Sequence, residues 1–266
     1  PNRFRPEFPR PARRPVITGG VDLAADPKRT ALCAIDWSSG SIELSDGPVD
    51  DDAIVALAHR APLSGWDVPL GWPDAFVAAI AKHHSGPGRG RGVAAAGPEE
   101  RRLMRYRLTD RRFAEGSDPA RWPLSVSTDM IGVPALRAAA LQRRLVDEGL
   151  VVDRSGGDGA VAETYPAGAL AAWGWPSRGY KGAPGRELRV DLVARLVAAL
   201  PTLSFSTEVR EAMVGSDDRL DALICALVAR AVATGRGTPP PEADLPAARR
   251  EGWIHVAGVS AERLSR

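Results

Sequence analysis

Val16-Ile17-Thr18-Gly19-Gly20-Val21-Asp22-Leu23-Ala24 has the pattern of a β-strand with two glycines near its middle. An acid inside a strand is costly unless it faces a cleft, a partner or a metal. A salt-bridged acid at a sheet edge is the alternative, but the glycines and the apolar surround argue against it. The stretch therefore predicts a central strand that carries a functional acid, Asp22, with room for another backbone close by.

The elements expected around this strand follow the order βββ-α-β-α, a helical insertion, and then β followed by helices. The chain opens with a three-stranded meander, because a turn at Ser38-Ser39-Gly40 separates two further strands. The further strands are expected over residues 29–37, 41–44, 65–69, 160–165 and 252–258, and helices over 50–59, 73–84, 133–148, 167–174, 186–200 and 217–234.

The composition is that of an ordinary globular protein, with 266 residues, 44% of them apolar and 26% charged. No apolar run approaches the roughly 18 residues of a membrane span, so no membrane association is expected. The N-terminus has no apolar segment of a secretory signal, which favours the cytoplasm. Cys33 and Cys225 lie in apolar stretches and are expected to be reduced core residues.

Charge is unevenly distributed along the chain. Residues 1–15 carry five Arg and five Pro and are expected to form a flexible basic arm. Residues 16–258 are expected to form one domain with a basic helical insertion at about 85–150, followed by a tail at 259–266. The stretch 82–121 holds ten Lys or Arg against five Asp or Glu, which makes it the most basic long region after the arm.

Two further acids lie close to expected strand ends. Pro69 cannot donate a hydrogen bond within a sheet, so it ends its strand and leaves Asp67 at the carboxyl end, where open α/β sheets bind ligands. An Asp bonding its own turn is an equally good reading of this motif. Glu163 precedes Pro166 in a similar way, but taken alone it fits a solvent-facing strand residue.

The helix expected from Asp217 has a clear apolar face, and its acids are placed unusually. Asp218 and Asp221 are three residues apart, so they share a side of the helix. Charge at a helix N-terminus accounts for Asp217 and Asp218 but not for Asp221, which borders the apolar face. Like charges at this spacing repel, so the pair calls for a compensating cation.

Carboxylates that converge from separate strands and a helix suit hard cations such as Mg²⁺ or Mn²⁺. Two such ions about 4 Å apart would activate a water and stabilise the leaving oxygen in phosphodiester hydrolysis. The sequence therefore predicts a two-metal carboxylate site.

The opening meander with Asp22, the acid that ends the fourth strand and the late Asp-x-x-Asp-Ala helix resemble the ribonuclease H-like fold, and the helix resembles that of its Holliday-junction resolvases. The whole set, over residues 16 to about 258, resembles the domain-of-unknown-function family 429, described as predicted nucleases of that fold. The matching segments are Gly20-Val21-Asp22, Asp67-Val68-Pro69-Leu70-Gly71, Arg107-Leu108-Thr109-Asp110-Arg111, Glu163-Thr164-Tyr165-Pro166, Asp217-Asp218-Arg219-Leu220-Asp221-Ala222 and Glu251-Gly252-Trp253-Ile254.

The resemblance implies an α/β fold with a mixed five-stranded sheet of order 3-2-1-4-5 and helices on both faces. Asp22 and Asp67 would lie on adjacent central strands, with the last helix packed over them. The implied metal ligands are Asp22, Asp67, Asp218 and Asp221, with Glu163 as an added ligand or a base that orients water.

Nucleic acid is the expected partner. Arg107, Thr109, Asp110 and Arg111 are interpreted as a clamp for substrate phosphates, with Lys181 as a further candidate. A solvated helix or loop face is the alternative for each of them.

Three functions remain open at this point. The leading hypothesis is a divalent-metal-dependent nuclease. The second is a catalytically inactive module of the same fold that binds nucleic acid or protein. The third is a nucleotide hydrolase or phosphotransferase, which the absence of a Gly-rich loop after Asp22 disfavours.

Overall fold

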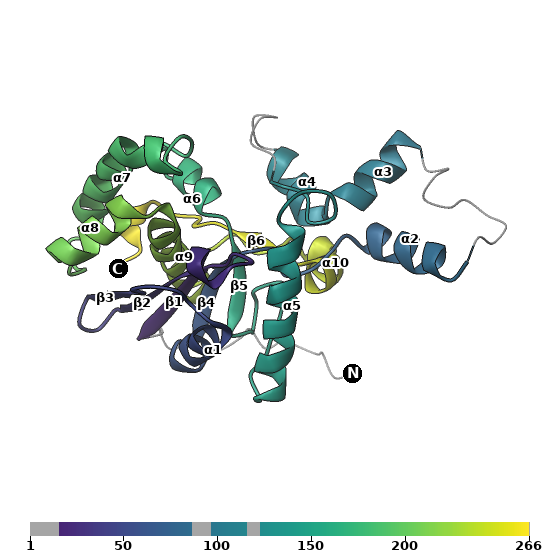
Figure 1. Cartoon of the computed structure of the whole chain (residues 1–266), viewed down its shortest axis with the longest axis horizontal. Coiled ribbons are helices and arrows are strands. Elements are labelled where there is room, and N and C mark those ends of the chain that lie inside the picture. Colours follow the sequence, from purple (N-terminus) through teal and green to yellow (C-terminus); the bar gives the residue numbers. More distant parts are fainter. Residues whose placement is uncertain (1–15, 87–96, 116–122, 266) are drawn as a thin grey trace, which may run out of the picture.

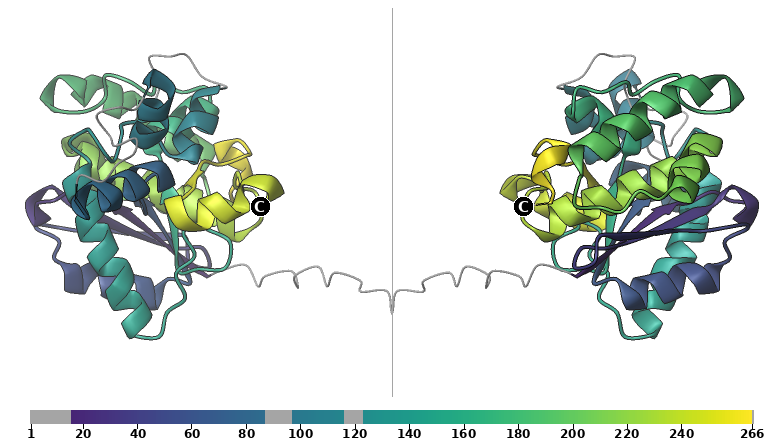
Figure 2. Two further views of the ribbon diagram at one scale, coloured as in Figure 1. Left: turned by 90° about the vertical axis from the view of Figure 1, so that its right-hand side faces the viewer. Right: turned by 90° about the vertical axis from the view of Figure 1, so that its left-hand side faces the viewer.

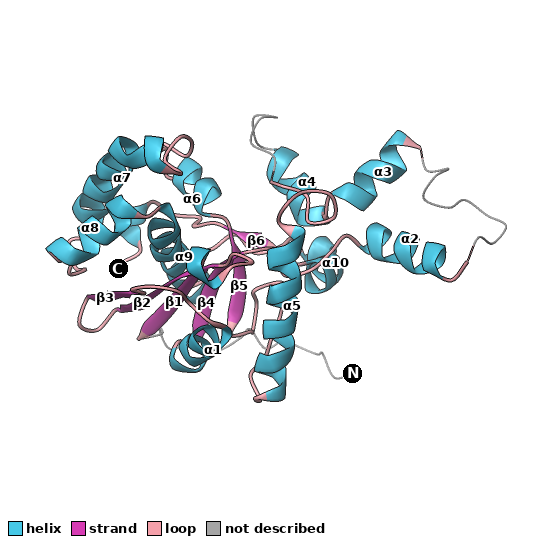
Figure 3. Cartoon of the chain, viewed as in Figure 1, coloured by secondary structure: helices cyan, strands magenta, loops and turns pink. Residues whose placement is uncertain are grey.

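The computed structural model describes residues 16–86, 97–115 and 123–265. Its centre is a mixed six-stranded sheet of order β3-β2-β1-β4-β5-β6 (Figures 1 and 3). The first three strands, β1 (Ile17–Asp22), β2 (Ala31–Asp36) and β3 (Ser41–Leu44), form the expected antiparallel meander. The predicted order 3-2-1-4-5 is therefore present, and a sixth strand extends it.

The other three strands, β4 (Leu63–Asp67), β5 (Val161–Thr164) and β6 (Ile254–His255), continue the sheet in parallel with β1. The carboxyl ends of four strands therefore meet at one edge. In the register of β1 against β4, Asp22 lies directly opposite Asp67. Asp22, expected inside its strand, is its last residue, and Asp67 ends β4 as expected.

Helices cover both faces of the sheet, as the side views of Figure 2 show. One face packs against α1 (Asp51–Arg60) and α5 (Gly132–Asp147) around the buried Trp66. The other face packs against α9 (Asp217–Ala233), and α6 (Pro166–Ala172), α7 (Arg186–Ala199) and α8 (Thr207–Gly215) pack around α9. The sheet is thus the middle of three layers.

The remaining helices lie beyond the β6 edge. Helices α2 (Asp74–His84) and α3 (Pro98–Arg105) extend away from the sheet, and α4 (Leu108–Glu115) and α10 (Leu245–Glu251) lie between them and the sheet (Figure 1). Within the expected insertion, α5 packs into the core, whereas α3 buries none of its residues. No helix in the described part of the chain is long and apolar enough to cross a membrane.

Helix α9 lies unusually close to the sheet because glycines face it. A Cβ atom at Gly20 of β1 would overlap the backbone carbonyl oxygen of Ala222, and one at Gly65 of β4 would overlap that of Cys225. The hydroxyl of Thr18 also donates to the carbonyl of Ala226 at 3.0 Å. Because the sheet covers one side and α6, α7 and α8 pack around the other, α9 is buried on all sides from Leu220 to Ala231 and not along one stripe.

Most elements agree with the sequence predictions within about two residues. The sequence did not predict α8 or α10, which are short helices of nine and seven residues. Within the predicted tail at 259–266, Ala261 and Leu264 are buried in the core. The predicted arm at 1–15 lies outside the described residues.

Replacing Gly20 by Ala tests the close contact between sheet and helix. The new methyl group would meet main-chain atoms of α9, which cannot rotate away, so we expect the free energy of unfolding to fall by about 3 kcal/mol or more. Urea unfolding measures the change. Gly215→Ala is the control, because no atom lies within 4 Å of the added Cβ and the residue ends a helix. Equal stability of the two variants would contradict this packing.

Candidate functional site

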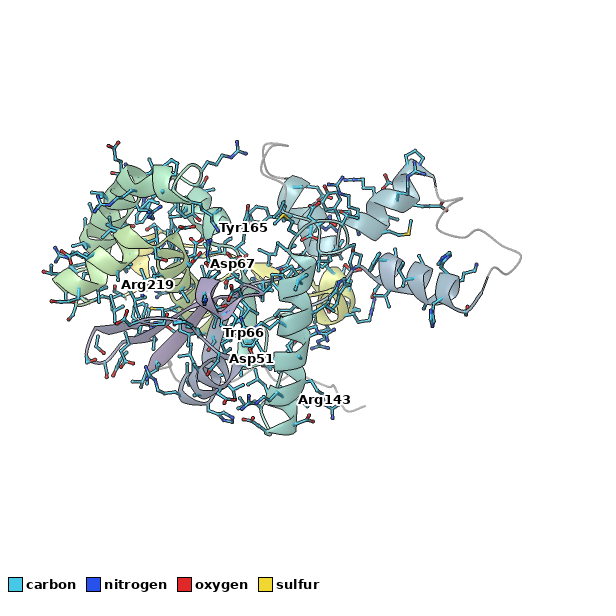
Figure 4. The ribbon with its side chains drawn as sticks, viewed as in Figure 1. Asp51, Trp66, Asp67, Arg143, Tyr165 and Arg219 are labelled. Atoms are coloured by element: carbon cyan, nitrogen blue, oxygen red, sulfur yellow. The ribbon has the colours of Figure 1, made fainter. Side chains whose placement is uncertain are left out.

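Asp22 and Asp67 point toward the same face of the sheet. Side chains alternate along a strand, so Asp22 shares the face of Gly20, and Asp67 that of Gly65, both of which meet α9. Trp66, one residue earlier in β4, points to the opposite layer (Figure 4). The two carboxylates are partly buried, and no hydrogen bond or ion pair joins either of them to another described residue.

Asp221 brings a third carboxylate to this edge. It lies in the first turns of α9 and its side chain is fully buried. The hydroxyl of Tyr180 donates to its Oδ1 at 2.9 Å, and the Nζ of Lys181 lies 2.7 Å from its Oδ2. The predicted helix acid is therefore held by two neighbouring residues of a loop.

The three carboxylates repel one another electrostatically. Burial, and then repulsion from Asp221 and Asp67, raises the pKa of Asp22 well above its usual range. Burial chiefly raises the pKa of Asp67 to about 7, with Lys181 lowering it and Asp221 raising it. Burial also raises the pKa of Asp221, against the attraction of Lys181. Such a group of acids favours a bound cation.

Asp218 lies at the rim of this group. Its two oxygens accept from Arg29 Nε at 3.1 Å and Arg29 Nη2 at 3.2 Å, and its charge adds slightly to the raised pKa of Asp22. Asp217 instead accepts from the backbone N–H of Gly182 at 3.2 Å. The two neighbouring acids thus have different partners.

Glu163 points to the other face of the sheet. It is paired in register with Trp66, whereas its neighbours Ala162 and Thr164 face α9. Its carboxylate receives two hydrogen bonds from Arg107, at 2.6 and 2.7 Å, and one from the backbone of Leu70 at 3.0 Å. The structure therefore does not bring Glu163 into contact with the other three acids.

The predicted phosphate clamp is mostly buried. Arg107 is 1% exposed, and its guanidinium also donates to both oxygens of Asp110. Thr109 accepts from the backbone of Ile254, and Arg111 donates to the carbonyl of Tyr106. Three of these four side chains are shielded from solvent, and together they join α4 to β5 and β6.

Glu251 completes this buried network. It accepts from the backbone of Leu108 at 2.6 Å and from that of Asp74 at 2.8 Å, while its own carbonyl accepts from Arg107. The segments around Arg107, Glu163 and Glu251, which lie far apart in the sequence, therefore form a single polar network that fastens α2 and α4 to the sheet.

Sequence reasoning missed two residues at the site. Tyr180 belongs with Lys181 and Gly182 to one candidate phosphate-binding motif, and the structure places its hydroxyl on Asp221. Arg29 pairs with an acid 189 residues away, for which no local signal exists. Tyr165 follows β5 directly and lies beside Asp67 (Figure 4). Burial and then the charge of Asp67 raise the pKa of its phenol.

The arrangement of carboxylates suits one hard cation in an open site better than a cation enclosed by protein ligands alone. Among the described residues no three His, Cys, Asp or Glu side chains are arranged to hold a metal ion. Mg²⁺ commonly uses only one or two protein carboxylates and completes its shell with water and substrate phosphates. Asp22 and Asp67, which are adjacent and have no hydrogen-bond partner in the part of the chain that the structure describes, provide such a pair.

Comparison with known proteins identifies a family. The family model described as "Protein of unknown function (DUF429)" matches residues 20–245. No curated protein and no solved structure matches the chain. The matched range contains the three central carboxylates and Lys181.

The raised pKa of Asp67 predicts a stability effect that depends on pH. Its folded-state pKa of about 7 exceeds the unfolded value of about 4, so ionisation makes the free energy of unfolding fall as pH rises between these values. Asp67→Asn removes that charge. In the absence of divalent ions we expect it to stabilise the protein by on the order of 2 kcal/mol at pH 8 and by little at pH 4.

Thermal unfolding at both pH values measures this difference. Asp147→Asn is the control, since Asp147 is exposed, pairs with Arg143 and has a lowered pKa, so its substitution should not stabilise. An Asp67→Asn variant less stable than wild type at pH 8 would show that the carboxylates do not oppose one another.

Arg107→Met tests whether Arg107 is structural. Removing it leaves Asp110 and Glu163 buried without their cation, so we expect a loss of about 3–5 kcal/mol in urea unfolding. Arg195→Met, which breaks an exposed pair with Asp191, should cost less than about 1 kcal/mol. A stable Arg107→Met variant that binds nucleic acid poorly would instead support the phosphate clamp.

Proposed function

The chain belongs to this family, and from its carboxylate edge we propose that it is a divalent-metal-dependent nuclease of ribonuclease H-like fold. The reaction is hydrolysis of a phosphodiester bond in nucleic acid, and the ion is Mg²⁺ or Mn²⁺. The proposal rests on the site and not on the fold alone, because one fold supports many activities.

The observation that carries the proposal is the pair Asp22 and Asp67. Two partly buried carboxylates lie side by side on adjacent parallel strands, with no hydrogen-bond partner among the described residues, and both have raised pKa values. A structural role would supply such acids with donors, as the chain does for Glu163. Their position at the carboxyl edge of the sheet also favours a ligand site.

The sheet supports the ribonuclease H-like assignment. An antiparallel meander of three strands, followed by two parallel strands in the order 3-2-1-4-5, is the arrangement that the resemblance implies. Here β6 is an addition at the outer edge.

The residues of the site would have distinct roles in the proposed reaction. Asp22 and Asp67 would hold the ion, which supplies charge stabilisation at a phosphoryl oxygen and lowers the pKa of the attacking water. Asp221, fixed by Tyr180, would keep Lys181 close to the phosphate. Water oxygen bonds to phosphorus, the ester P–O bond breaks, and the proton lost by water balances the one gained by the leaving oxygen.

The surface beyond the β6 edge supports a polyanionic substrate. Helix α3 exposes Arg101, Arg102 and Arg105, and a groove between α2 and α3 has these arginines on its rim beside Phe76 and Tyr106. Arginine matches phosphate oxygens with paired donors, and aromatic rings stack on bases. The basic insertion at about 85–150 is therefore proposed to bind nucleic acid.

Asp22→Asn tests the nuclease directly. Losing one of two ion-holding carboxylates should slow cleavage at least about 100-fold, while binding of nucleic acid persists or tightens because a negative charge is removed. Cleavage of single-stranded, double-stranded and branched DNA and RNA is measured with Mg²⁺ and with Mn²⁺, and binding is measured by fluorescence anisotropy.

Asp147→Asn, at the far end of α5, serves as the control and should cleave like wild type. Full cleavage by Asp22→Asn would contradict the proposal. Salt-dependent binding by wild type without cleavage of any substrate would favour the inactive binding module.

A further inference from the structure

The ammonium of Lys181 lies among the acids of the site. Its Nζ is 2.7 Å from Asp221 Oδ2, and the side chain is 55% exposed, so the cation reaches the cluster from the solvent side. Burial tends to lower the pKa of Lys181, but the charges of Asp221, Asp67 and Asp22 together raise it. The group therefore stays protonated and balances part of the negative charge.

The loop that carries Lys181 is fixed by several contacts. The guanidinium of Arg189 donates to the carbonyl oxygens of Tyr180 and Gly182, each at 2.6 Å, and to that of Val214 at 2.9 Å. The backbone of Gly182 donates to Asp217 at the start of α9. The loop is thus tied to the helix that carries Asp221, and its backbone is held on both sides of Lys181.

Lysine is an unusual choice in this chain. The sequence contains only three lysines, at positions 28, 82 and 181, and otherwise relies on arginine for its positive charge. An ammonium is a compact point charge, whereas a guanidinium is a broad planar fork. Of the two, the ammonium more closely resembles a small metal ion in size and in its demand for oxygen partners.

We propose that Lys181 takes the place of a second divalent ion, so that the site holds one ion through Asp22 and Asp67 and a fixed ammonium at Asp221. The inference rests on the proposed function and refines it, because the sequence alone predicted two ions. An ion at Asp221 Oδ2 would need the space that the ammonium occupies 2.7 Å away. The three negative charges of the carboxylates are then balanced by the two positive charges of the divalent ion and the single positive charge of the ammonium.

Counting Mn²⁺ ions tests this directly. Isothermal titration calorimetry and the EPR signal of free Mn²⁺ measure the number of ions bound by the full chain. We expect one ion for wild type and two for Lys181→Met, in which the ammonium no longer competes at Asp221. Lys28→Met, which removes an exposed lysine, should bind one ion like wild type.

Lys181→Arg is a second control for the substitution at this position. It keeps a positive charge beside Asp221 and should therefore bind one ion like wild type. Thermal unfolding gives a second readout, because a second site in Lys181→Met should let Mn²⁺ raise its Tm more than that of wild type.

The outcomes separate this inference from the proposed function. Two ions in wild type, or one ion in a folded Lys181→Met with an unchanged Tm response, would overturn the role of Lys181 and leave a metal-dependent nuclease intact. No Mn²⁺ binding by any variant would contradict the proposed function and this inference with it.

Discussion

The contact between the backbone of α9 and the glycines of two central strands is the constraint on which the site depends. Gly20 and Gly65 let the helix approach until its carbonyl groups touch the sheet. Asp22 lies two residues after Gly20 and Asp67 two residues after Gly65, so each acid shares the face of its glycine. The close approach of α9 to this face therefore also brings Asp221 beside the two acids. Packing and site geometry therefore have one cause, and a change that loosens the helix would also disperse the carboxylates.

Electrostatic repulsion between the acids at this edge destabilises the fold. Elsewhere the chain neutralises buried acids with arginine, as Arg107 does for Glu163 and Asp110, and the side chains of all three are at most 3% exposed. Within residues 16–86, 97–115 and 123–265, Asp22 and Asp67 have no such partner, and their repulsion is only partly offset by Lys181. Unfavourable charge of this kind is characteristic of sites shaped for a ligand, where part of the stability is given up for function.

The sequence predicted the order of the strands and the acids that meet because both depend on local patterns. The Pro after Asp67 and the helical spacing of Asp221 are visible in a few residues. The face on which Glu163 lies could not be read from the sequence, because side chains alternate with a period of two and the face depends on which neighbour packs against α9. Arg107 and Lys181 could not be told apart as buried and open cations, since their partners lie far away in the chain.

The central claim is that Asp22 and Asp67 together hold a divalent ion. Anomalous diffraction from crystals soaked in Mn²⁺ tests it most directly, because the scattering locates the ion without any assumption about activity. The account predicts a peak bonded to carboxylate oxygens of both Asp22 and Asp67, at distances near 2.1–2.2 Å, with Lys181 still beside Asp221. A structure at saturating Mn²⁺ with no ion at this pair, or with the ion held by other residues, would contradict it.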